Sequence, residues 1–260
     1  MNILVFVKQV PDTESKIRIA SDRKSIIEDD LTFILNPYDE YAIEEALRIR
    51  EKREGKVTAI SIGPERAIAA IRKCLAMGAD EGFLVKDEAG ELYDALRISR
   101  IIAQTIKKKF PDYDLILFGK QSVGADNSSV PSMVAEFLNL PQINVVTELT
   151  LEENKCVALR EIEGALEEVE FSLPAVISAQ KGLNEPRYET LKGIMMAKRK
   201  EIPVITLEEL ELSEEELTSA IEINQIDPPP PRPAGKIIEG TPEEAAKKLV
   251  ELLHNEAKII

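Results

Sequence analysis

The stretch LILFGKQSVGADNSSVP, residues 115–131, contains a strand, a loop and the start of a helix in direct succession. Its first four residues form a short apolar run, as expected of a buried parallel strand, and Ser129 to Leu138 predicts a helix. Three more strands followed by helices are predicted upstream. The strands are Ile3 to Val7, Val57 to Ile62 and Gly82 to Val85, and the helices are Asp39 to Arg53, Pro64 to Met77 and Leu92 to Phe110. This alternation predicts an α/β fold around a parallel sheet with right-handed crossovers.

The pattern changes after the helix that ends at Leu138. The segments Gln142 to Leu151, Lys155 to Glu161 and Glu167 to Leu173 predict antiparallel strands, with turns at Glu153-Asn154 and Glu163-Gly164. Val176 to Ser178 predicts one further strand of the sheet. We therefore expect an antiparallel hairpin region added to the parallel sheet.

Prolines crowd the segment that precedes the last predicted helix, at Pro228 to Pro231 and at Pro233. Proline fixes φ and removes a backbone donor, so this segment predicts an extended arm. Thr241-Pro242 then begins a helix with a stripe of apolar side chains. We expect an α/β domain at residues 1–205 and, at residues 206–260, an arm and helix that pack on a partner subunit.

Composition excludes several classes of protein. A net charge of −14 over 260 residues argues against nucleic-acid binding, which needs a basic surface. The single histidine, His254, makes a histidine-based metal site or catalytic triad unexpected. Cys74 and Cys156 are predicted to be packed thiols. No apolar run approaches the roughly 20 residues that span a bilayer, and the chain begins in a strand rather than in a basic leader. These features favour a cytoplasmic protein without a membrane span.

The loop after Phe118 is the strongest local candidate for a binding site. Ligands of open α/β sheets bind at the carboxyl ends of strands. Gly124 permits close approach of the backbone, Asn127 to Ser129 supply short polar groups, and the first amides of the next helix favour an anion. The loop is not a Walker motif, because no Gly-Lys-Ser/Thr follows it. It predicts either a phosphate site or a capped polar turn.

Two other strand ends are expected along the same edge of the sheet. Asn36-Pro37-Tyr38-Asp39 precedes the first long helix, and Ser61 to Pro64 joins the second strand to its helix. Asn36 is a candidate for reading the edge of an adenine, or simply for the turn that starts a helix. The backbone at Ile62 and Gly63 is a candidate for packing on a base or a ribose.

A second functional segment reads LNEPRYETLKGIMMAKRK, residues 183–200. It places Leu191, Ile194, Met195 and Met196 beside three basic residues. This combination suits a partner protein with an apolar pocket and an acidic rim. The alternative is a helix that buries Leu191 and Ile194 in the core of its own chain.

Residues 183–200 closely resemble the recognition loop of the beta subunits of electron-transfer flavoproteins. Further matches to that family occur in its order along the chain, at Val7 to Asp12, Asn36 to Glu40, Ala76 to Asp80, Phe118 to Gln121, Arg160 to Gly164 and Pro228-Pro229. The resemblance implies a Rossmann-like sheet of the adenine-nucleotide α-hydrolase type. It also implies half of a heterodimer, in which the alpha subunit holds the redox FAD and this chain binds a structural AMP and has no catalytic centre of its own.

The resemblance also implies roles for single residues. Contacts to AMP are expected from Phe6, Asn36, Pro37, Tyr38, Asp39, Ile62, Gly119, Lys120, Gln121, Ser122, Val123, Gly124, Ala125, Asp126, Asn127, Ser128, Ser129 and Val130. Leu191, Ile194 and Met195 are expected to dock flavin dehydrogenases, such as acyl-CoA dehydrogenases, whose electrons pass to a quinone-linked acceptor. Glu161 and Thr13 are expected to meet the flavin domain. Thr13 replaces a tyrosine of some members, and the loop lacks a glutamine often present before its helix.

Three alternatives remain at this stage. A bifurcating member of the same family would hold a second FAD in place of AMP. An ATP-using enzyme of the related fold would need glycines after the first strand, and Lys8 to Ser15 contains none. A homodimeric stress-type nucleotide-binding module would leave the proline arm and residues 183–200 without a role.

Overall fold

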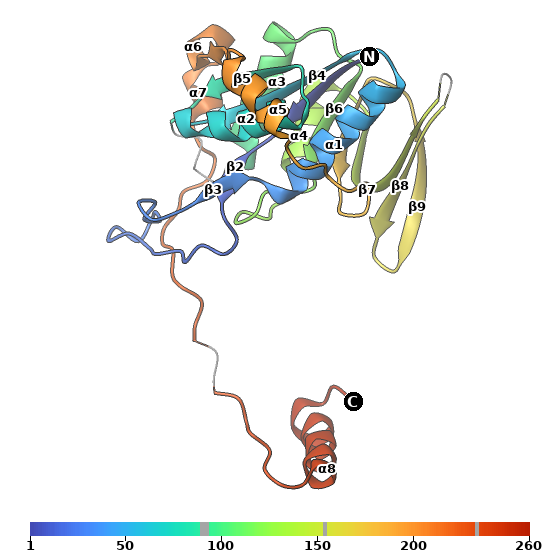
Figure 1. The fold of residues 1–260 in the computed structure, drawn as a ribbon. Coiled ribbons are helices and arrows are strands. Elements are labelled where there is room, and N and C mark those ends of the chain that lie inside the picture. The colour runs from blue at the N-terminus through green and yellow to red at the C-terminus, as the bar shows by residue number, and fades with distance from the viewer. Residues whose placement is uncertain (89–93, 153–154, 232–233) are drawn as a thin grey trace.

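The computed structural model describes residues 1–88, 94–152, 155–231 and 234–260, and its fold is built on one nine-stranded sheet (Figure 1). The strands lie in the order β11-β5-β4-β1-β6-β10-β7-β8-β9. Their bounds are β1 Asn2–Phe6, β4 Lys56–Gly63, β5 Glu81–Lys86, β6 Leu115–Gly119, β7 Gln142–Leu151, β8 Cys156–Ile162, β9 Ala165–Phe171, β10 Ala175–Ala179 and β11 Val204–Ile205. The four strands predicted in the first half of the chain, β1, β4, β5 and β6, pair in parallel, which confirms the α/β class.

Strand β7 connects the parallel and antiparallel parts of the sheet. It pairs in parallel with β10 and antiparallel with β8, which in turn pairs antiparallel with β9. The prediction that Gln142 to Leu151 is an antiparallel strand was therefore right for its pairing with β8 and wrong for its pairing with β10. The reason is that β10, which follows β9 in the chain, returns to lie between β6 and β7. The predicted turn at Glu153-Asn154 lies outside the described residues.

Two hydrophobic cores cover the two faces of the sheet. Successive side chains of a strand point to opposite faces, and β1 shows this directly: Ile3 and Val5 belong to one core, Leu4 and Phe6 to the other. Helices α1 (Pro37–Lys52), α2 (Ile68–Met77, preceded by the 3₁₀ turn Glu65–Ala67) and α5 (Leu191–Arg199) contribute to the first core. Helices α3 (Ala95–Lys109), α4 (Val130–Leu138) and α6 (Leu207–Leu210) contribute to the second.

Several elements have no counterpart in the sequence prediction. Strands β2 (Gln9–Pro11) and β3 (Phe33–Leu35) form a separate antiparallel pair, with a long loop between them. The short strand β11 and the single-turn helices α6 and α7 (Glu214–Leu217) are too short to produce a clear period. The predicted helix Leu92 to Phe110 is observed as α3, and its first two predicted residues lie outside the described part.

The C-terminal segment begins packed and then leaves the domain. Leu210 of α6 is fully buried, and Arg97 donates through Nε to the carbonyl of Leu217 at 2.6 Å. Ser219 and Ala220 donate to Asp94, and Ile226 donates to the carbonyl of Arg23. Figure 1 shows that the chain then continues as an extended arm that ends in α8 (Pro242–Leu252), followed by a π-helical turn (Leu253–Ala257). The partition at residue 205 stays a prediction, although residues 207–217 pack on the first unit. No described helix is both long and apolar enough to cross a lipid bilayer.

Candidate functional site

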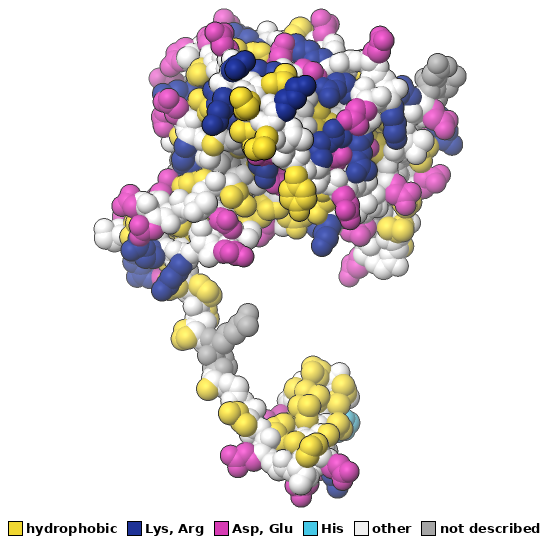
Figure 2. All heavy atoms as spheres, viewed as in Figure 1, with side chains coloured by type: hydrophobic (Ala, Val, Ile, Leu, Met, Phe, Trp, Pro, Cys, Tyr) yellow, Lys and Arg dark blue, Asp and Glu magenta, His cyan; other side chains and the backbone are white. Residues whose placement is uncertain are grey.

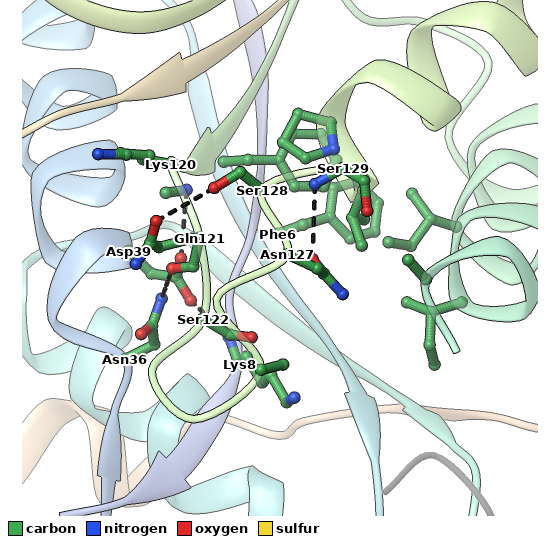
Figure 3. Close-up of a pocket in the computed structure, with 18 of the residues that line it drawn as sticks. Phe6, Lys8, Asn36, Asp39, Lys120, Gln121, Ser122, Asn127, Ser128 and Ser129 are labelled. Carbon is green, nitrogen blue, oxygen red and sulfur yellow. Dashed lines mark hydrogen bonds between the residues drawn. The ribbon is translucent and has the colours of Figure 1, made fainter. Parts of the chain in front are cut away.

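A cavity lies at the carboxyl ends of β1, β4 and β6, beside the first turns of α3 and α4 (Figure 3). It contains about 790 Å³ of space, part of which is open to solvent. This is the edge at which ligands of open α/β sheets bind. The position of the cavity therefore agrees with the site expected from the sequence.

Most of the residues expected to contact a nucleotide line this cavity. They are Phe6, Asn36, Asp39, Ile62, Gly119, Lys120, Gln121, Ser122, Ala125, Asn127, Ser128, Ser129 and Val130. Five expected residues, Pro37, Tyr38, Val123, Gly124 and Asp126, are not among the lining residues. Their role as direct contacts stays a prediction. Each of them lies next in the chain to a residue that lines the cavity.

The sequence analysis missed one wall of the cavity. Asp94, Ala95, Ile98 and Ile102 of the α3 region line it, together with Val7, Lys8, Phe118 and Pro131. A signal for this wall was present in the sequence, because aspartate is a favoured N-cap residue. In the structure Asp94 caps α3 by accepting from the amides of Leu96 and Arg97. A helix that begins after β5 starts at the same edge of the sheet as the other strand-to-helix loops.

Asp39, in the first turn of α1, joins the ends of the two central strands. Its Oδ2 accepts from the amide of Lys8 at 2.7 Å, just beyond β1, and its Oδ1 accepts from the amide of Gly119 at 3.1 Å, at the end of β6. Burial raises the pKa of Asp39 to about 7, against the opposing effect of these hydrogen bonds. Asp39, which also lines the cavity, therefore holds the start of α1 against the ends of β1 and β6.

Gly119 is required by the closeness of α1 to the end of β6. A Cβ at this position would lie 2.3 Å from Asp39 Oδ1 and 2.6 Å from the carbonyl carbon of Tyr38. No side chain fits at these distances, so the glycine permits the contact between strand end and helix start.

The side chain of Asn36 supports the loop after β6 and does not cap α1, the helix that begins directly after Asn36. Its Nδ2 donates to the carbonyl of Gln121 at 2.8 Å, and its Oδ1 accepts from the amide of Val123 at 3.1 Å. It makes no side-chain cap to α1, and it is almost fully buried. Both polar ends of the side chain are thus used to support the loop, and a direct reading of an adenine by Asn36 stays a prediction.

The loop after β6 is organised by its own side chains (Figure 3). Gln121 donates through Nε2 to Asp126 Oδ1 at 2.6 Å and accepts from Ser128 Oγ at 3.1 Å. Positive φ angles at Gly124, Asp126 and Ser128 turn the chain so that α4 begins at the cavity. In the described structure Ser129 gives α4 no side-chain cap. Amides of this first turn are therefore suited to an anionic ligand.

The cavity lining combines apolar side chains with charged groups, namely Lys8, Lys120, Asp39 and Asp94. Phe6 and Phe118 stack with ring centroids 5.3 Å apart and an interplanar angle of 14°. Ile62 and Ile98 lie on the lining as well, while Lys8 and Lys120 supply positive charge. Such a site accommodates a flat apolar ring together with a phosphate.

A second exposed feature lies on α5 and the segment before it. Tyr188, Leu191, Met195 and Met196 are 94%, 84%, 62% and 53% exposed, and we call these four residues the α5 patch. Figure 2 shows hydrophobic side chains over α5 bordered by Lys and Arg. Ile194, also expected to dock a partner, is half-buried and packs against the core. The sequence analysis did not single out Tyr188, although its exposure is the largest of the four.

Helix α5 is closely fixed to α2. A Cβ on Gly193 would lie 2.2 Å from the carbonyl oxygen of Ala76, so the glycine permits direct packing of the two helices. Thr190 caps α5 by accepting from the amide of Gly193 at 2.9 Å. Arg72 of α2 donates through Nη1 to the carbonyl of Ala197 at 2.6 Å. Helix α5, which carries Leu191, Met195 and Met196 of the patch, is therefore packed directly on α2.

The two residues expected to meet a flavin domain lie away from the cavity lining. Glu161, near the end of β8, accepts from Gln180 Nε2 at 3.0 Å. Thr13 is exposed in the loop that follows β2. Their proposed contacts depend on a partner chain and stay predictions.

Comparison with known proteins decides the family. A model of the electron transfer flavoprotein domain matches residues 24–210. The electron transfer flavoprotein subunit beta of Bacillus subtilis (strain 168) is 40% identical over 262 residues, which cover 100% of both chains. The chain belongs to the electron transfer flavoprotein family. The electron transfer flavoprotein subunit beta of Homo sapiens is also similar, at 40% identity over 97% of this chain and 98% of the relative. The family resemblance found in the sequence is therefore confirmed, and a role in electron transfer follows.

Proposed function

We propose that the chain is the beta subunit of a heterodimeric electron transfer flavoprotein that carries electrons from flavin dehydrogenases to a quinone-linked acceptor in the cytoplasm. In this proposal the alpha subunit holds the redox FAD, and the present chain is an electron-carrier component without a catalytic centre. Acyl-CoA dehydrogenases are the donors that the family resemblance favours. Similarity to beta subunits over the whole chain supports the proposal.

The cavity at the strand ends is the proposed site of a structural AMP. The observation that carries this assignment is the supported loop after β6, which Asn36 holds at Gln121 and Val123 and which delivers the first turn of α4 to the cavity. Lys8 and Lys120 add positive charge for a phosphate, and the Phe6–Phe118 stack offers an apolar wall for a base. A second FAD in place of AMP is the outcome that would indicate a bifurcating member.

The α5 patch is the proposed docking surface for dehydrogenases. Leu191 is the most exposed of its aliphatic side chains, and Lys192, Lys198 and Arg199 beside it are also exposed. A small apolar anchor with a charged border gives a contact that forms and dissociates rapidly, as a carrier with several partners requires. The extended arm and α8, with exposed Leu249 and Val250, are proposed to pack on the alpha subunit.

The test is mass spectrometry of the ligands released from the heterodimer after co-expression with its alpha subunit. We expect one AMP and one FAD per heterodimer. Two flavins without AMP would replace the proposal with the bifurcating alternative. A flavin bound by this chain when purified alone, or turnover of a substrate by it unaided, would refute the carrier role.

A further inference from the structure

Glu44 on α1 is a charged side chain in an almost fully buried position. Its side chain is 3% exposed. Glu44 Oε2 accepts from Arg187 Nε at 2.7 Å and from the Arg187 amide at 3.1 Å, and Oε1 accepts from Arg187 Nη2 at 3.1 Å and from Arg48 Nε at 2.7 Å. One carboxylate therefore binds both the guanidinium and the backbone of a residue far away in the sequence.

The segment around Arg187 is tied to α1 at two further points. Asn184 donates through Nδ2 to the carbonyl of Tyr41 at 3.0 Å and to Glu45 Oε2 at 2.9 Å. Arg48 donates through Nη2 to the carbonyl of Glu185 at 3.1 Å. Residues 184–187 are thus held along α1 immediately before the residues that carry the α5 patch.

The arrangement makes Glu44 the centre of these ties. Burial raises the pKa of Glu44, but hydrogen bonds from Arg187 and Arg48 outweigh it and lower the pKa overall, so the carboxylate stays charged. The carboxylate of Glu44 is buried, whereas the side chains of Arg187 and Arg48 are partly exposed. Loss of this carboxylate removes charge-assisted hydrogen bonds from both arginines, which costs more than loss of a surface pair. The second partner of Arg187, Glu51, is half-exposed and is such a surface contact.

We propose that Glu44 is the positioning residue of the docking surface: by holding Arg187, it fixes the segment that leads into α5 and presents Leu191 to the docking protein. The proposal rests on the docking function proposed above. Thr190 and Gly193 fix α5 itself, whereas Glu44 fixes the approach to it, including the exposed Tyr188. Glu44 does not touch the docking protein in this account and acts only through Arg187.

The experiment compares Glu44→Gln, Arg187→Lys and Glu51→Gln in the intact heterodimer. Two quantities are measured: hydrogen exchange of residues 184–197, and KM and kcat for the heterodimer as electron acceptor of a flavin dehydrogenase. We expect Glu44→Gln to speed exchange in residues 184–190 and to raise KM about tenfold with kcat within about twofold. Arg187→Lys keeps the charge but loses the bidentate geometry, so an intermediate effect is expected. Glu51→Gln is expected to change KM by less than about twofold.

Controls separate this proposal from the docking function itself. Glu81→Gln removes the exposed pair with Lys56 on another part of the sheet and should match the parent. Leu191→Ala tests docking directly. If Leu191→Ala raises KM while Glu44→Gln changes neither exchange nor KM, the positioning role is refuted and docking stands. If Leu191→Ala leaves KM unchanged, docking by the α5 patch is refuted, and the exchange measurement alone decides whether Glu44 orders the segment. Should Glu44→Gln not fold, Arg187→Lys gives the same comparison.

Discussion

Asp39 Oδ1 accepts a hydrogen bond from the amide of Gly119 at 3.1 Å, and because Gly119 has no side chain the start of α1 lies directly against the end of β6. The other carboxylate oxygen of Asp39 binds the amide of Lys8 beyond β1. This contact places the loop after β6 against α1. It links the proposed adenylate site to a helix whose middle portion also holds the proposed docking segment through Glu44.

Gly119→Ala is expected to disrupt the proposed adenylate site. The added Cβ would stand 2.3 Å from Asp39 Oδ1, so β6 and α1 must move apart. Such overpacking costs about 1–3 kcal/mol, and AMP content of the purified heterodimer should fall with it. Glu81→Gln is the control, because it removes only the exposed pair with Lys56 and lies outside the cavity lining. Equal AMP content in the two variants would contradict the prediction.

Asn36→Ala is expected to loosen the loop without removing any charge. It leaves the carbonyl of Gln121 and the amide of Val123 without their partner, at a cost of about 1–3 kcal/mol for buried polar groups. AMP should dissociate faster, and the melting temperature of the heterodimer should fall. Competition with labelled AMP measures the dissociation rate. A variant with unchanged AMP retention would show that the loop keeps its shape without Asn36.

Asp39 gives the heterodimer a specific pH dependence. Burial raises its pKa to about 7 in the folded chain, compared with about 3.9 in an unfolded chain. The folded state therefore binds more protons between these values, and the stability contributed by Asp39 is fully present below about pH 4 and is lost as the pH rises through 7. Asp39→Asn cannot titrate.

The melting temperature of the parent minus that of the Asp39→Asn heterodimer should therefore fall between about pH 4.5 and pH 7, and this difference should level off above about pH 7. A thermal melt at half-unit pH steps checks this. A difference that stays constant with pH would mean that Asp39 does not titrate in this range.

Leu191→Ala is expected to weaken docking while leaving both cofactors in place. The side chain is 84% exposed, so its loss should not affect folding. Loss of an apolar anchor at an interface costs about 1–2 kcal/mol, which corresponds to a KM increase of roughly 5- to 30-fold. Val204→Ala on β11, 45% exposed and outside the α5 patch, is the control. Equal rates for Leu191→Ala and the parent would remove the docking surface from the proposal.

Gly193→Ala is expected to displace α5 as a unit. Its Cβ would stand 2.2 Å from the carbonyl oxygen of Ala76 on α2, and backbone atoms cannot yield as a flexible side chain would. We expect a loss of about 1–3 kcal/mol in stability and a KM increase comparable to that of Leu191→Ala, with AMP content unchanged. Glu81→Gln again serves as the control, because it removes only an exposed pair with Lys56. An AMP loss in Gly193→Ala would show that the two sites are not independent.

The sequence by itself determined the α/β class, the parallel first half and the edge of the sheet at which the cavity lies. These features depend on short-range patterns, namely apolar runs of strands, helical periods and the turns between them. Family resemblance added the expected AMP contacts of the loop after β6 and the expected docking role of residues 183–200. Leu191 and Met195 are exposed as that resemblance implies, whereas Ile194 is turned half inward.

Only the tertiary structure decided which groups meet. Asp94 joins the cavity wall, Asn36 supports the loop instead of capping α1, and β7 is parallel on one side because β10 inserts beside it. Arg187 reaches Glu44 across 143 positions of sequence. The physical reason is the same in each case: such contacts join residues distant along the chain, and a local pattern carries no information about its partner until the chain has folded.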